Sequence, residues 1–180
     1  MKRYMNEFFK LKCAPDLLAW KLFPNAKEIT ESFGAFKGVR DVILEPTNLR
    51  FDDPSIVLVS VGDGVTPRTA ALFAVRTSWE CYSVDPLMRV DVNYPIDRLS
   101  VIKAKIEDLK LDFPERSVII VSVHGHAKLN DILEHIHGKV RHFLTIPCCI
   151  SHNIPNKVYL GYTDTNIWSD KNEVKVWLNI

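Results

Sequence analysis

Two glycines and an aspartate form the first set of residues in this sequence that could bind a ligand. Gly62 and Gly64 follow an apolar run at 56–61, and Asp85 ends a second apolar run after a segment rich in Ala, Leu and Phe. This order predicts a strand, a turn, a helix and a second strand, and glycine lets the chain turn sharply and a ligand approach the backbone. A carboxylate about 20 residues beyond the glycines can accept hydrogen bonds from a ribose. The stretch therefore predicts a nucleoside site.

A structural interpretation of the same residues stays open. A dinucleotide fingerprint would place a third glycine near Thr66 or Pro67, and neither position has one, so a pyrophosphate at the start of the next helix is poorly supported. The two glycines could serve only the geometry of the turn. Asp85 could likewise serve only to cap the segment that begins at Pro86.

Histidines and cysteines follow two later apolar runs, at 117–123 and 140–146. If these runs pair as strands, one end of the sheet would carry His124, His126, Cys148, Cys149 and His152. The near-neutral pKa of histidine suits a group that orients or deprotonates a substrate, so His124 and His126 are the predicted catalytic residues. A thiolate nucleophile at Cys148 or Cys149 is an alternative, as is a pair of inert thiols that ends a strand.

The same side chains are soft and borderline metal ligands. No Cys-x-x-Cys or His-x-x-x-His spacing anchors them, so the sequence predicts no metal site. The other three histidines are expected on solvated surfaces of a helix and a strand: His135, His137 and His142.

The elements that must position these residues follow from the hydrophobic periodicity. Strands are predicted at residues 56–61, 79–84, 99–104, 117–123 and 140–146. Helices are predicted at 69–77 and from about 129 onwards, with Gly138 as the stop of the second one. Alternating residues at 158–163 and 173–178 predict an antiparallel hairpin. Three more helices are predicted before residue 48, and they would either pack on an edge of the sheet or form a lid over the substrate.

Composition favours one soluble domain. At 180 residues, of which 47% are hydrophobic, the chain is long enough to bury a single core. The formal net charge of +1 gives no overall attraction to nucleic acid or to an anionic membrane, although a local basic patch would still allow nucleic acid to bind. The four cysteines lack the spacing of a disulfide framework, which favours a reducing, cytoplasmic setting. No apolar run approaches a signal-peptide core or a membrane span, so no membrane association is expected.

The order of the elements from about residue 56 to the end resembles the class I S-adenosylmethionine-dependent methyltransferases. The resemblance implies an α/β fold, with a Rossmann-like seven-stranded sheet that ends in an antiparallel hairpin at residues 49–180 and a helical extension at 1–48, together forming one compact unit. It implies S-adenosylmethionine as the cofactor. The methionine part would lie beside Gly62, Asp63 and Gly64, the ribose on Asp85, and the adenine against Ile106 and Glu107.

The sequence departs from the family in three places. Ser60 and Lys105 stand where the family often has acids. The connection at 149–157 is too short for the usual helix, so that face of the sheet is expected to be thin or covered by the N-terminal helices. A narrower resemblance, carried by His124-Gly125-His126 and Pro147-Cys148-Cys149, is to methyltransferase-like domains with His-x-Cys-Gly after the fourth strand and Pro-Cys-Cys after the fifth.

Three functions are consistent with these features. The first is methyl transfer to an acceptor that the sequence does not identify, whether RNA, protein or a small molecule. An Asp/Asn-Pro-Pro-aromatic segment is absent after the fourth strand, which argues against the common amino-methylating enzymes. The second is a nucleoside-binding or partner-binding module without catalysis, in line with the missing acid at Ser60. The third, an NAD-dependent oxidoreductase, is disfavoured by the terminal hairpin and the missing third glycine.

Overall fold

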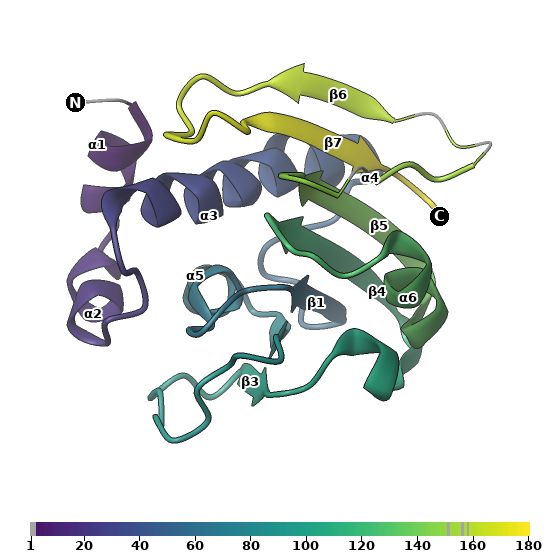
Figure 1. Cartoon of the computed structure of the whole chain (residues 1–180), viewed down its shortest axis with the longest axis horizontal. Coiled ribbons are helices and arrows are strands. Elements are labelled where there is room, and N and C mark those ends of the chain that lie inside the picture. The colour runs from purple at the N-terminus through teal and green to yellow at the C-terminus, as the bar shows by residue number, and fades with distance from the viewer. Residues whose placement is uncertain (1–2, 151, 156, 158) are drawn as a thin grey trace.

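The computed structural model describes residues 3–150, 152–155, 157 and 159–180, and they form a mixed seven-stranded sheet in the order β3-β2-β1-β4-β5-β7-β6 (Figure 1). The strands are β1 (Ile56–Val61), β2 (Glu80–Val84), β3 (Leu99–Ile102), β4 (Leu111–Val123), β5 (Ile136–Ile146), β6 (Leu160–Thr163) and β7 (Glu173–Trp177). The first five strands run parallel, whereas β7 is antiparallel to both β5 and β6. The predicted α/β sheet with a terminal hairpin is confirmed.

Helices are present before residue 48, at about 69–77 and from residue 129 onwards, as predicted. They are α1 (Arg3–Phe9), α2 (Ala14–Ala19), α3 (Ala26–Gly38), the π-helical η1 (Val39–Leu44), α4 (Glu45–Thr47), α5 (Arg68–Arg76), the 3-10 turn η2 (Ile106–Asp108) and α6 (Leu129–His135). Helix α3 begins where the Asn25 side chain accepts a hydrogen bond from the Glu28 amide at 3.1 Å, which satisfies one of the free amides of its first turn.

Helices α3 and α5 cover one face of the sheet. Figure 1 shows α3 running across the sheet beside β5 and β7, with α1 and α2 near its beginning. Phe36 of α3 packs on Phe73 of α5, with ring centroids 5.1 Å apart, and both belong to one core cluster with Leu144 of β5. The described residues of the short connection at 149–157 contain no helix. Ile154 of this connection belongs to the other core cluster, with Ile132 of α6, so α3 does not cover the face that the connection crosses, and the expectation that the N-terminal helices would cover it is wrong.

The opposite face is covered by α6 and η2, and two predictions about this region are wrong. Helix α6 ends at His135, and Gly138 lies inside β5 instead of stopping the helix. Strand β4 begins at Leu111 because its first residues pair with the start of β5, where Leu111 lies opposite Ile136. The first residues of β4 and of β5 show no hydrophobic alternation that would predict a strand, because each of these segments is stabilised by pairing with the other.

His142 corrects another prediction. Its side chain was expected on a solvated surface, but the residue is only 2% exposed. Burial lowers the pKa of its imidazole. Within the part of the chain that the structure describes, no helix is both long enough and apolar enough to cross a bilayer.

Candidate functional site

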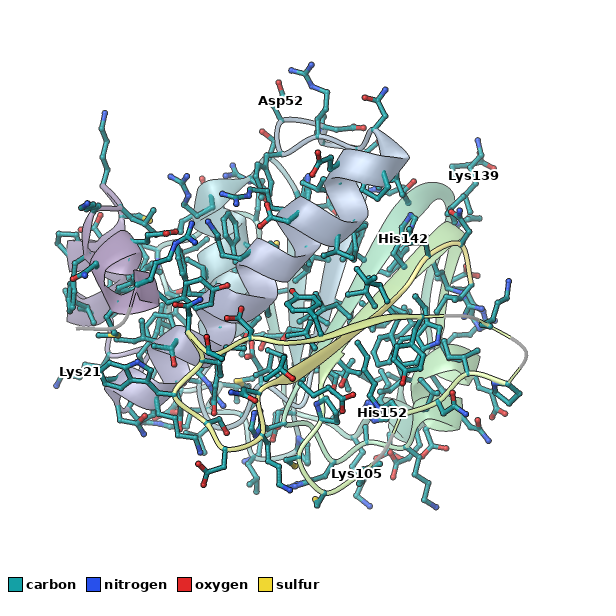
Figure 2. All side chains as sticks on the ribbon, turned by 90° about the horizontal axis from the view of Figure 1, so that it is seen from above. Lys21, Asp52, Lys105, Lys139, His142 and His152 are labelled. Carbon is teal, nitrogen blue, oxygen red and sulfur yellow. The ribbon has the colours of Figure 1, made fainter. Side chains whose placement is uncertain are left out.

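A cavity of about 520 Å³ lies at the carboxyl ends of the parallel strands. Figure 2 shows Lys105, which follows β3 and lines this cavity, at the opposite end of the molecule from Asp52, which precedes β1. The cavity brings together all but one of the site residues predicted from the sequence: Gly62, Gly64, Asp85, Ile106, Glu107, His124 and His126. Open α/β sheets bind ligands in this crevice, and the volume falls in the range of small-molecule pockets.

The turn after β1 is held by the acid that ends β2. Gly62 and Gly64 have φ of 79° and 82°, a left-handed conformation that side chains other than glycine adopt at a cost. The Gly64 amide donates to Oδ2 of Asp85 at 2.9 Å, and the Leu87 amide donates to Oδ1 at 2.7 Å. Each carboxylate oxygen keeps a further acceptor position. Asp85 therefore fixes the turn and its own loop, as in the structural interpretation, while it also lines the cavity.

The loops that follow β1 and β4 touch at a pair of glycines. A Cβ atom added to Gly62 would lie 2.5 Å from the Cα atom of Gly125. A Cβ atom added to Gly125 would lie 2.8 Å from the carbonyl oxygen of Val61. Gly125 is thus required for this close approach, a role that sequence reasoning missed although Gly125 lies between the two predicted histidines.

Asp63 is the one predicted site residue that does not line the cavity. It is 2% exposed, and its carboxylate accepts hydrogen bonds from the amides of Thr69 and Ala70 at 3.0 and 3.1 Å and from the Ser83 hydroxyl at 2.8 Å. Amides in the first turn of a helix have no partner within the helix, so a buried carboxylate beside them is stabilising. Asp63 joins the beginning of α5 to β2 and supports the cavity from behind.

His124 leaves β4 in a left-handed conformation, with φ of 54°. Its Nε2 atom lies 3.5 Å from Oε1 of Glu31 on α3, and among the described residues neither atom has a hydrogen-bond partner. Burial lowers the pKa of His124 to about 4, and burial also raises the pKa of Glu31. The imidazole is therefore uncharged at neutral pH, and it faces a carboxyl group that sequence analysis did not place beside it.

The helical extension also holds the glycine turn through α5. The Arg68 guanidinium lies 3.2 Å from the Glu28 carboxylate of α3 and donates to the Asp63 carbonyl. The Thr66 hydroxyl donates to the Leu22 carbonyl at 2.6 Å. The residues that line the cavity all lie at 61–127, so the extension supports the turn through these contacts without lining the cavity itself. These contacts were not predicted, because they join segments far apart in the sequence whose meeting only the packing of α3 on the sheet decides.

The histidines and cysteines that follow β4 and β5 divide into two groups. The Cys148 Sγ atom lies 3.4 Å from Nε2 of His126 and 3.4 Å from Sγ of Cys149. His152 is turned inward instead, with its ring nitrogens 2.9 Å from the Thr145 hydroxyl and 3.2 Å from the Ala127 carbonyl. Burial lowers the pKa of His152. Pairing of β4 with β5 thus makes neighbours of these residues, as predicted.

No protein-family model matches the sequence. No curated protein matches it either. Among solved structures, MtNAS in complex with S-adenosylmethionine superimposes with a TM-score of 0.52 and 12% identity, over 97% of this chain and 69% of that chain. MtNAS in complex with MTA and tNA gives the same TM-score and identity over 99% of this chain and 69% of that chain. At this identity the likeness concerns the fold alone.

Proposed function

We propose that this chain, which has the class I S-adenosylmethionine-dependent methyltransferase-like fold, binds S-adenosylmethionine at the carboxyl ends of β1, β2 and β4 and transfers its methyl group to an acceptor. The observation that carries the proposal is the unit formed by Asp85 and the Gly64 amide, because it presents a carboxylate and an open backbone turn to one cavity. The MtNAS structure of the same fold, crystallised with S-adenosylmethionine, supports the choice of ligand.

The lining of the cavity offers a place for each part of this ligand. The backbone of Gly62 and Gly64, which lines the cavity, would lie beside the methionine part. The free acceptor positions of Asp85 would bind the ribose hydroxyls. Ile106 and Glu107 would face the adenine, Ile106 from an almost buried position and Glu107 from the rim.

The acceptor would approach the ends of β4 and β5. There His124 and His126 are the groups proposed to orient or deprotonate it, since both line the cavity. Glu31 would act as a positioning residue, because its Oε1 atom lies 3.5 Å from the Nε2 atom of His124. A proton taken up by the imidazole would be stabilised by that carboxyl group in its charged form.

A binding module without catalysis is the second candidate. The observation that favours it is the pKa of His124, which burial lowers to about 4, since a general base is most effective when its pKa is near the working pH. Transfer of a labelled methyl group from S-adenosylmethionine to fractionated cell extract separates the two candidates. Label in an RNA, protein or small-molecule fraction supports the enzyme, and tight cofactor binding with no transfer to any fraction supports the module.

A further inference from the structure

Three metal-ligating side chains lie together at the rim of the cavity, in a group defined here as the thiol–imidazole cluster: His126, Cys148 and Cys149. Their ligand atoms all lie within 4.8 Å of one another. The three side chains are at least partly exposed, and neither Cys148 nor Cys149 forms a disulfide. The proposed methyl transfer does not require either thiol.

The sheet positions the cluster. Val123 and Ile146 are partners at the ends of the parallel strands β4 and β5, and the His124 amide donates to the Ile146 carbonyl at 2.9 Å. The two loops therefore leave the sheet side by side, one carrying the imidazole and the other the two thiols. Their meeting depends on strand pairing, which explains why no local ligand spacing reveals it in the sequence.

The distances suit a tetrahedral zinc ion. Zinc binds sulfur at about 2.3 Å and imidazole nitrogen at about 2.0 to 2.1 Å, so two of its ligand atoms lie about 3.5 to 3.8 Å apart. In the cluster, Cys148 Sγ lies 3.4 Å from both His126 Nε2 and Cys149 Sγ. The third pair, His126 Nε2 and Cys149 Sγ, lies within 4.8 Å.

We propose that the thiol–imidazole cluster binds one zinc ion through His126, Cys148 and Cys149. Three protein ligands leave a fourth position for water or another small ligand, as in sites that are not purely structural. His126 lines the large cavity, while Cys148 and Cys149 line a neighbouring hollow of about 280 Å³. The zinc ion would therefore lie between the cavity and the hollow, where an acceptor could contact it. That contact with an acceptor rests on the proposed function, whereas zinc binding does not.

Titration of zinc into reduced, chelator-treated protein tests the site, with affinity and stoichiometry measured by calorimetry. We expect about one zinc per chain, and a loss of affinity of at least about 100-fold in Cys148→Ser, Cys149→Ser and His126→Ala. Cys13→Ser is the matched control, since Cys13 is a free, half-buried cysteine outside the cluster, and it should bind zinc as the wild type does. Cobalt(II) should give thiolate charge-transfer absorption in the wild type and lose it in Cys148→Ser.

Two results would overturn the site. One is an absence of zinc binding by reduced protein whose circular dichroism shows that it is folded. The other is equal zinc affinity in the wild type and the three cluster variants. Binding of S-adenosylhomocysteine is measured on the same samples. If the protein binds zinc but not S-adenosylhomocysteine, the zinc site is supported and the proposed function is contradicted.

Discussion

The Oδ2 atom of Asp85 accepts a hydrogen bond from the Gly64 amide at 2.9 Å, so the acid at the end of β2 and the glycine turn after β1 form one unit. This bond joins the two features that first indicated a nucleoside site. It also means that loss of the carboxylate would act in two ways, by removing a ribose partner and by releasing the turn. Experiments on this site must therefore measure stability beside affinity.

The two glycines of the turn differ in what surrounds them. A Cβ atom on Gly62 would meet the backbone of Gly125 at 2.5 Å, whereas one on Gly64 would meet the end of the Arg68 side chain at 2.7 Å. A side chain can move aside and a packed backbone cannot. We expect Gly62→Ala to lower the free energy of unfolding by about 3 kcal/mol or more, and Gly64→Ala by about 1 kcal/mol from the left-handed conformation alone. Urea denaturation measures both, and equal losses would contradict the close approach of the two loops.

His124→Ala separates catalysis from structure. If His124 deprotonates the acceptor, turnover should fall by about 10² to 10⁴ while affinity for S-adenosylhomocysteine stays nearly unchanged. His137→Ala, at a half-buried position outside the cavity, is the control. A fall in melting temperature with no selective effect on turnover would assign His124 to the packing of α3 instead, through its contact with Glu31.

Acid should destabilise the fold through its buried histidines. Burial lowers the pKa of His142 and of His152 in the folded state, and that of His124 to about 4. In the unfolded chain, these imidazoles bind protons below the ordinary histidine pKa of about 6.5. In the folded chain they stay uncharged at that pH, so the free energy of unfolding should fall as the pH falls from about 6.5.

Denaturation at a series of pH values measures this dependence. The free energy of unfolding of His142→Leu should depend less steeply on pH than that of the wild type, because one buried imidazole is removed. His137→Asn should keep the pH dependence of the wild type. A pH dependence in His142→Leu as steep as that of the wild type would contradict the assignment.

The features that could be predicted from the sequence are those that depend on residues close together in the chain. The strand at 56–61, the glycines and Asp85 lie within one βαβ unit, so their order alone fixes their arrangement. Asp63 belongs to the same unit, yet the sequence could not show that it would turn away from the cavity to accept hydrogen bonds from the amides at the start of α5.

The parts that were not predicted depend on packing between distant segments. Glu31 reaches His124 only because α3 packs on the sheet beside α5, far from His124 in the sequence. The extensions of β4 and β5 exist only as partners of each other. His142 on β5 is likewise buried by packing that its neighbours in the sequence do not reveal.

The central claim is that the cavity binds the nucleoside of S-adenosylmethionine through Asp85. Calorimetric titration with S-adenosylhomocysteine and with NAD tests it most directly, on the wild type, on Asp85→Ala and on the control Asp91→Ala, whose carboxylate is exposed and pairs with Arg89. We expect S-adenosylhomocysteine to bind the wild type and Asp91→Ala equally, NAD to bind neither, and Asp85→Ala to lose about 1.5 to 3 kcal/mol of binding free energy while still folded. Equal affinity in wild type and Asp85→Ala, or no binding by the folded wild type, would contradict the account.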